Sequence, residues 1–166
     1  MVEFNLIDQL KALLASPYLW AAMGAYVIGQ LTKVILIANK RRITLRDFIS
    51  SGNMPSTHTA SVVALAAVAG VQQGLGSPIF GIATMFALVI AYDAMHVRRA
   101  VGEQGLILTQ MIADMPKEQQ KKYGDVLYKH TGRTGTYPYF SRGHLPEEVL
   151  VGALLGAVVG IAIGLL

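Results

Sequence analysis

Four stretches of this chain are apolar for close to the length that a helix needs to cross a lipid bilayer. They cover residues 19–38, 58–75, 78–96 and 149–166, and the hydrocarbon core requires about 20 predominantly apolar residues. Only 14% of all residues are charged, whereas about a quarter are charged in a soluble domain. The sequence therefore predicts one all-α domain over residues 1–166, a small membrane bundle with about four transmembrane helices.

Two further segments have the composition of surface helices. Residues 1–16 alternate apolar and polar side chains, which is typical of an interfacial helix, and Pro17 is expected to end it. Residues 106–129 combine apolar patches with a charged run, so we expect one or two helices on the cytoplasmic membrane surface with solvated charges. The chain has no cysteine, which excludes a disulfide framework and a thiolate metal site.

The basic residues are distributed unevenly between the predicted spans. Of the 14 lysines and arginines, four lie between the first two spans and eight between the last two. The positive-inside rule therefore predicts a multi-pass protein of the cell membrane with both connections in the cytoplasm. A net charge of +4 without a soluble basic domain favours contact with membrane phosphates over nucleic-acid binding.

A polar, turn-forming run passes directly into the second apolar segment at Pro55-Ser56-Thr57-His58. Pro55 suits a first helical position, so the amides of Ser56, Thr57 and His58 are expected to lack intrahelical acceptors. Such a helix end binds anions; here Ser56 and Thr57 add hydroxyl groups and His58 adds an acid–base group. The alternative is a serine-capped helix whose histidine faces the lipid headgroups.

A second polar segment precedes the last span. His144 lies four residues before Glu148, which is about one helical turn, and a histidine oriented by a carboxylate is the pattern of an activated nucleophile. The alternative is a surface histidine beside an unrelated acid. The span that follows has a glycine at every fourth position, which predicts a narrow ridge for close helix packing. These residues are Gly152, Gly156, Gly160 and Gly164.

Ionisable residues also lie within or beside the apolar segments. Lys33 is in the first span, where it either extends to the interface or points inward to an anion. Asp93 lies near the end of the third span, where a carboxylate requires a basic or hydrogen-bonding partner. Arg99 and Glu103 have the spacing of an ordinary helical ion pair.

Taken together, these motifs resemble the type-2 phosphatidic acid phosphatase superfamily, which also includes the vanadium-dependent haloperoxidases. The segments that carry the resemblance are residues 52–58, 92–104 and 144–152, and they are most similar to the divergent bacterial and plant branch of the superfamily. The resemblance covers most of the chain. It implies a membrane phosphatase that acts on a phosphorylated lipid, such as a polyprenyl phosphate or diphosphate, and requires no metal or other cofactor.

The resemblance also implies roles for individual residues. His144, oriented by Glu148, would attack phosphorus and form a phosphohistidine, and His58 would protonate the leaving alkoxide and later activate water. Asp93 and Glu103 would support the site. The phosphate-binding residues would be Lys33, Lys40, Arg41, Ser56, Thr57, Arg98, Arg99 and Arg142.

The chain departs from the superfamily pattern at three positions. Thr57 replaces a glycine, Glu148 replaces an aspartate, and Pro138 stands where an arginine is expected, six residues before His144. The residues that could replace this arginine are Arg98, Arg99 and Arg142. Two alternatives to hydrolysis therefore stay open, namely binding or transport of an anionic lipid and vanadate-dependent haloperoxidase chemistry. A homo-oligomer is compatible with each of them.

Overall fold

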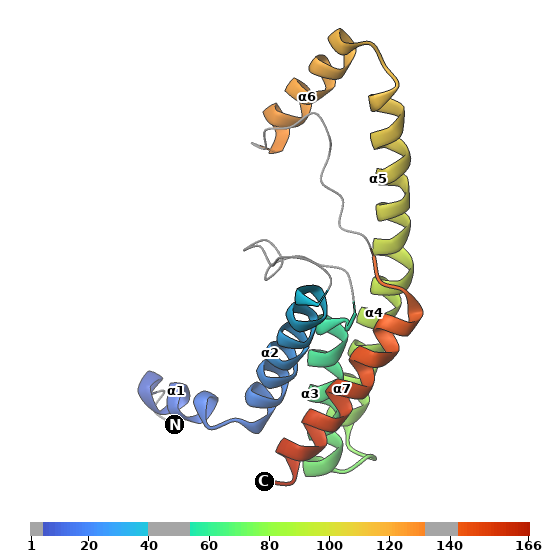
Figure 1. Ribbon diagram of the computed structural model, residues 1–166. Coiled ribbons are helices and arrows are strands. Elements are labelled where there is room, and N and C mark those ends of the chain that lie inside the picture. The colour runs from blue at the N-terminus through green and yellow to red at the C-terminus, as the bar shows by residue number, and fades with distance from the viewer. Residues whose placement is uncertain (1–4, 40–53, 132–142) are drawn as a thin grey trace.

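The computed structural model describes residues 5–39, 54–131 and 143–166, with the side chains of residues 127–131 left out. These parts of the chain are helical, and α2, α3, α4 and α7 pack together as a bundle (Figure 1). The prediction of an all-α membrane bundle is confirmed. In chain order the elements are α1 (Leu6–Leu14), α2 (Pro17–Ala38), α3 (Thr57–Gln73), α4 (Pro78–Tyr92), the π-helix η2 (Asp93–Val97), α5 (Arg98–Ala113), α6 (Lys117–Thr131) and α7 (Pro146–Gly164).

Three helical stretches in the described chain are long and apolar enough to cross a membrane, namely Pro17–Ala38, Pro78–Ala113 and Pro146–Gly164. The expected fourth span, α3, has 17 residues, which is the lower limit for a transmembrane helix. The second stretch has 36 residues and is about 54 Å long at 1.5 Å per residue, whereas the hydrocarbon core is about 30 Å thick. Its last part, α5, therefore extends beyond the bundle (Figure 1).

Small side chains on α3 form the centre of the bundle. Ala60, Ala64 and Val68 follow one helix face, are 0% exposed, and pack with Ala21 and Ala25 of α2. Small residues allow helix backbones to approach closely, which matters in a membrane because lipid chains are as apolar as the protein core. The alanine-rich composition of α3 thus explains why this helix contacts α2, α4 and α7 together.

The predicted glycine ridge of α7 packs against α3. A Cβ atom added at Gly152, Gly156 or Gly160 would collide with a backbone carbonyl group of α3 or of its N-cap residue. The ridge is therefore a packing surface on which any side chain larger than hydrogen is excluded. The facing carbonyls belong to Ser56, Ala60 and Ala64.

We expect Gly156→Leu to destabilise the bundle, because leucine would force α7 away from the Ala60 carbonyl. Overpacking of a closely packed site costs about 1–3 kcal/mol of unfolding free energy. The measurement is the thermal unfolding midpoint of the purified protein in detergent. Gly81→Leu is the matched control, since a Cβ at Gly81 of α4 meets nothing within 4 Å. Equal midpoints for the two variants would contradict a packing role for the ridge.

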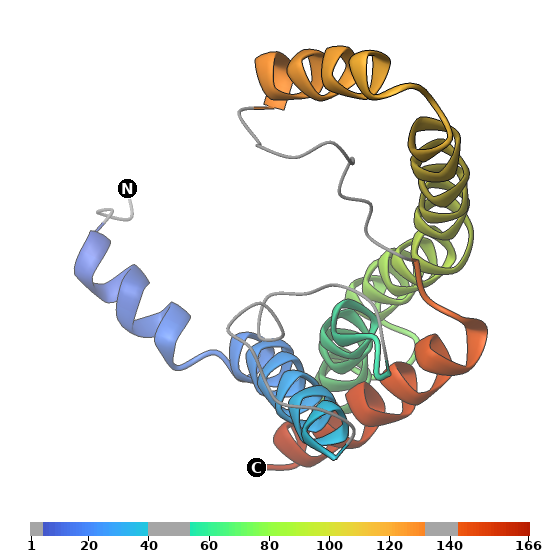
Figure 2. The same cartoon turned by 45° about the horizontal axis from the view of Figure 1, so that its top comes forward.

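The N-terminal helix is separate from the first span, as predicted. The Asn5 side chain accepts a hydrogen bond from the Ile7 amide at 3.1 Å and caps α1. Trp20 Nε1 donates to the Leu14 carbonyl at 2.6 Å and so connects the end of α1 to α2. Both views place α1 to one side of the bundle, and its apolar residues are exposed (Figures 1 and 2). An interfacial position in the membrane remains a prediction.

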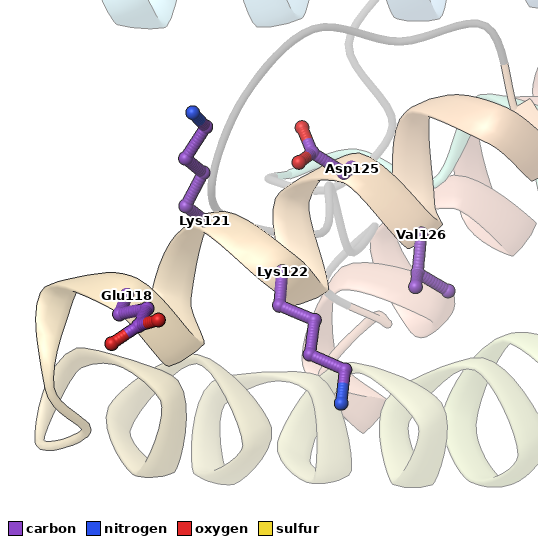
Figure 3. Close-up of a pocket in the computed structure, with 5 residues that line it drawn as sticks. All are labelled: Glu118, Lys121, Lys122, Asp125 and Val126. Carbon is purple, nitrogen blue, oxygen red and sulfur yellow. The ribbon is translucent and has the colours of Figure 1, made fainter.

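The charged run of α6 is solvated, as expected. Figure 3 shows the side chains that line a hollow beside this helix. The hollow has a volume of about 370 Å³. Its lining side chains are exposed and carry charges of both signs, so they do not form a selective anion site. They are Glu118, Lys121, Lys122, Asp125 and Val126.

Candidate functional site

The polar ends of several helices meet at one end of the bundle. These are the C-terminal half of α2, the N-termini of α3 and α7, and η2 (Figure 1). Two backbone hydrogen bonds connect them. The Ser56 amide donates to the Glu148 carbonyl at 3.0 Å, and the His144 amide donates to the Ala94 carbonyl at 3.0 Å. The two polar helix starts that stand out in the sequence are therefore directly joined.

A buried histidine, His144, pairs with the partly buried Glu148. His144 is 5% exposed, and its Nδ1 atom lies 2.9 Å from Glu148 Oε2. The same carboxylate oxygen accepts a hydrogen bond from the Leu145 amide at 3.1 Å. A carboxylate on Nδ1 fixes that nitrogen as the protonated one and leaves the electron pair of Nε2 available. This is the arrangement that a nucleophilic histidine requires.

The surroundings of His144 favour its neutral form. Burial lowers the pKa of His144, the hydrogen bond and charge of Glu148 raise it, and the charges of Lys33 and Arg98 lower it again, so the net direction is downward. A neutral imidazole at pH 7 retains the electron pair on Nε2. The pair with Glu148 thus orients the ring without keeping it protonated.

Lys33 points into the bundle from α2. Its side chain is 1% exposed, which excludes the alternative in which it extends to the membrane interface. Its positive charge interacts electrostatically with Glu148, His58 and His144. A buried ammonium group is costly without a negative partner. The Glu148 carboxylate supplies one negative charge, and Lys33 is placed to attract a second anion to the same cluster.

The helix α3 begins one or two residues later than the sequence suggests. The prediction that Pro55 opens the helix with a free Ser56 amide is wrong, because that amide is bonded to the Glu148 carbonyl and Ser56 lies outside the helix as its N-cap. The alternative of a helix capped by the serine side chain is wrong too. Ser56 stands at the N-cap position, but its hydroxyl pairs with the Thr59 hydroxyl at 2.9 Å and makes no capping hydrogen bond to the helix amides. The amides at the start of the helix are those of Thr57, His58 and Thr59.

The side chains at this helix start differ in exposure. Ser56 and Thr57 are buried, whereas His58 is exposed. The His58 ring lies edge-on to Tyr26, with 6.3 Å between the ring centroids. His58 interacts electrostatically with His144. The site therefore holds one buried and one accessible histidine in the same cluster.

The third span ends in a π-helix that the sequence did not reveal. The Arg98 amide donates to the Asp93 carbonyl, five residues back, and the Ala94 carbonyl accepts the His144 amide instead. Because a π-helix repeats its hydrogen bonds at a spacing of five residues, Asp93 and Arg98 meet on one face. Arg98 Nε lies 2.6 Å from Asp93 Oδ2, so Asp93 has the basic partner that its position required.

The arginines that could replace the one missing at Pro138 have different positions. Arg98 interacts electrostatically with both His58 and His144. Arg99 instead pairs with Glu103, with 2.9 Å between Nε and Oε1, on the exposed surface of α5. Three predicted phosphate ligands, Lys40, Arg41 and Arg142, lie outside the described residues.

Gly143 allows the segment before α7 to approach the third span. A Cβ atom at this position would collide with the backbone of Arg99 and meet that of Arg98. Only a glycine permits such a close approach. Gly143 therefore helps to place His144 against η2, a role that its neighbours in the sequence do not indicate.

The fold and the site together define a small helical membrane protein with two histidines, a buried lysine and a paired arginine at one end of its bundle. The chain belongs to the Divergent PAP2 family, whose model matches residues 14–159. It is also similar to the Uncharacterized membrane protein YuiD of Bacillus subtilis (strain 168), with 30% identity over 153 residues, 83% of this chain and 87% of that relative. No solved structure matches. The family resemblance inferred from the motifs is confirmed.

Proposed function

We propose that this protein hydrolyses a phosphomonoester or diphosphate of a membrane lipid or polyprenol through a phosphohistidine intermediate. The observation that carries the proposal is the buried His144, whose Nδ1 is held by Glu148 in a cluster that contains His58. Membership in a phosphatase-like membrane family supports the same reaction class. The cell membrane is the expected location.

In the first step, Nε2 of His144 attacks phosphorus while the bond between phosphorus and the lipid oxygen breaks. His58 gives its proton to the departing oxygen, because an alkoxide is a poor leaving group. The lipid alcohol leaves from a monoester, or the lipid monophosphate from a diphosphate, and a phosphohistidine remains with Glu148 hydrogen-bonded to its Nδ1 proton. Glu148 stabilises the positive charge that develops on the imidazole during the attack.

In the second step, His58 removes a proton from a water molecule. The resulting hydroxide attacks phosphorus, the bond between phosphorus and Nε2 breaks, and inorganic phosphate is released. His144 is again neutral, and His58 is again protonated for the next turnover. The accessible position of His58 in the cluster suits this exchange with water and with the leaving group.

The cations and the α3 helix start would hold the phosphate oxygens. Charge on these oxygens must be stabilised in the transition state, and catalysis of phosphoryl transfer depends mainly on such positioning. Lys33 of α2 and Arg98 of α5 supply positive charge, and the amides at the start of α3 supply further hydrogen-bond donors. Additional ligands from the predicted set are Ser56, Thr57, Lys40, Arg41 and Arg142, and Asp93 positions Arg98. Arg99 and Glu103 are instead paired with each other on the exposed surface of α5.

The proposal is tested by phosphate release from purified protein over a panel of lipid and polyprenyl phosphates and diphosphates. His144→Ala is the control for contaminating phosphatases. Release by the parent and none by the variant is the expected result. If no substrate is cleaved while anionic lipid still binds, the second candidate function, binding or transport of that lipid by the same cluster, replaces hydrolysis.

We expect Arg98→Ala to lower kcat/KM for a lipid phosphate by about 10- to 100-fold. A hydrogen bond to a charged group contributes about 1.5–3 kcal/mol, and each 1.36 kcal/mol is a factor of 10 in rate. Arg98→Lys should recover part of the loss, because it restores charge without the planar guanidinium. Arg99→Ala is the matched control, since Arg99 is paired with Glu103. A larger loss in Arg99→Ala than in Arg98→Ala would reverse the assignment.

We propose that the site faces the cytoplasm, because twelve of the 14 basic residues lie in the two connections on that side. Because the chain has no cysteine of its own, a single cysteine introduced at Gln120 of α6 reports the orientation. It should react with a membrane-impermeant maleimide only after the cells are opened. Labelling in intact cells would place the site on the outer face.

A further inference from the structure

An apolar groove of about 500 Å³ is lined by residues of α3, of α4 and η2, and of α7. The groove residues of the third span follow one helical face. The first and last of them are 15 residues apart, which corresponds to about 22 Å along a helix. They are Phe80, Thr84, Ala87, Leu88, Ala91 and Met95.

One end of the groove is lined by residues that neighbour the polar cluster. Pro146, at its upper end, follows His144 by two residues. Thr59 lines the groove and shares its hydroxyl hydrogen bond with Ser56. Met95 also lines it and belongs to η2, the element whose Ala94 carbonyl holds the His144 amide. A molecule bound in the groove would thus have one end at the histidines.

The long side of the groove is accessible from the surroundings of the bundle. Leu88 and Leu150 are lining residues from α4 and α7, and they are 58% and 61% exposed. Both belong to stretches long and apolar enough to cross a membrane. The groove therefore opens toward the region that lipid chains occupy, whereas one end is lined by Thr59, Met95 and Pro146, which adjoin the polar cluster.

We propose that this groove binds a single hydrocarbon chain of the phosphorylated lipid, with the phosphate at the histidine cluster. The positive charges at one end complement the phosphate, and the apolar walls complement the chain. A methylene group is about the size of a water molecule, which occupies about 30 Å³ in the liquid. The groove therefore accommodates on the order of 15 methylene groups. This is enough room for one hydrocarbon chain. The inference rests on the proposed function for the identity of the headgroup.

Binding is measured separately from turnover with alkyl phosphonates of increasing chain length, which carry the anionic headgroup but have no phosphate ester to hydrolyse. Affinity for the purified protein in detergent should rise with chain length and become constant at about 15 carbons, where the groove is filled. Affinity that is independent of chain length would overturn the proposal.

Two alanines of α4 provide a matched pair of variants. Ala87 lines the groove and is 7% exposed, whereas Ala83, one turn away, is 8% exposed and lines a separate apolar hollow of about 360 Å³. Ala87→Leu should weaken binding of the longest phosphonate by about 10-fold or more while changing binding of the shortest one little, because one or a few extra methylene groups block an apolar pocket. Ala83→Leu should leave both affinities unchanged. Equal losses in the two variants would contradict the location of the chain.

A long-chain phosphonate with a photoreactive group at its chain end gives a second measurement on the parent protein. Crosslinks on α4 between Phe80 and Leu88 are expected, and crosslinks confined to α1 or α6 would overturn the proposal. The outcome is distinct from that of the hydrolysis test. Length-dependent binding without phosphate release would remove the phosphatase and keep the chain site, and phosphate release without length dependence would do the opposite.

Discussion

His144→Ala is expected to abolish phosphate release while leaving the affinity for lipid phosphate largely unchanged. The imidazole is the proposed nucleophile, so its loss removes the covalent step, whereas Lys33, Arg98 and the α3 amides would still attract the phosphate. The decrease in kcat should be at least about 10³-fold, as expected when a nucleophile is deleted from a catalytic group that acts as a unit. The measurement is phosphate release at saturating substrate, with binding followed in parallel.

Glu148→Gln separates the roles of the pair. Glutamine keeps the shape of the side chain and the backbone carbonyl that accepts the Ser56 amide, but it removes the negative charge beside Nδ1. We expect reduced turnover together with a lower unfolding midpoint, because the buried Lys33 ammonium loses its negative partner. If His144→Ala turns over at the parent rate, His144 is not the nucleophile.

The pH profile provides a check on the same histidine. Because burial lowers the pKa of His144, the neutral form that attacks phosphorus persists below the usual histidine range. Activity that depends on neutral His144 is fully present above its pKa and is lost as the pH falls through it. The acid limb assigned to the nucleophile should therefore lie below pH ~6.5, and an acid limb above that value would contradict the direction of this pKa shift.

His58→Ala is expected to lose about 10²- to 10⁴-fold in turnover of natural lipid phosphates, the usual contribution of a positioned acid or base. The loss should be much smaller for an aryl phosphate with a good leaving group, because that group departs without a proton. The comparison of the two substrates isolates proton transfer from phosphate binding, since a purely binding role would lower both rates equally.

His96→Ala is the matched control for His58→Ala. His96 is an exposed residue of η2 and stacks on Tyr92 with 4.2 Å between ring centroids. It has the same chemistry but lies outside the proposed phosphate cluster. Equal losses for both substrates in His58→Ala would assign this residue to binding instead of acid catalysis.

Much of the site could be predicted because the order of the spans determines which helix ends lie together. Lys33, His58, Asp93 and His144 come from four different elements, and antiparallel packing of successive helices brings them to one end. The pair of His144 and Glu148 was predicted from a helical spacing of four, but its actual basis is the N-terminal cap of α7, in which Glu148 folds back to the Leu145 amide and meets His144 just before the helix. Periodicity and spacing are properties of the sequence itself.

Other features depend on contacts between distant segments and could not be predicted locally. The start of α3 is displaced because the Glu148 carbonyl, more than 90 residues away in the chain, binds the Ser56 amide. Asp93 and Arg98 are five residues apart, a spacing at which an α-helix does not bring two side chains together. This spacing was the one signal of the π-helix in the sequence. The choice among the arginines and the orientation of Lys33 likewise followed only from packing.

The hydrogen bond from the His144 amide to the Ala94 carbonyl has a consequence for how such proteins tolerate substitution. Both partners are main-chain groups, which every residue type at position 94 carries, and any residue except proline at position 144 supplies the donor. Selection on side chains therefore does not act on this anchor directly. Because Ala94 is 4% exposed, relatives can exchange it for another small residue and still hold the histidine in place through this main-chain contact.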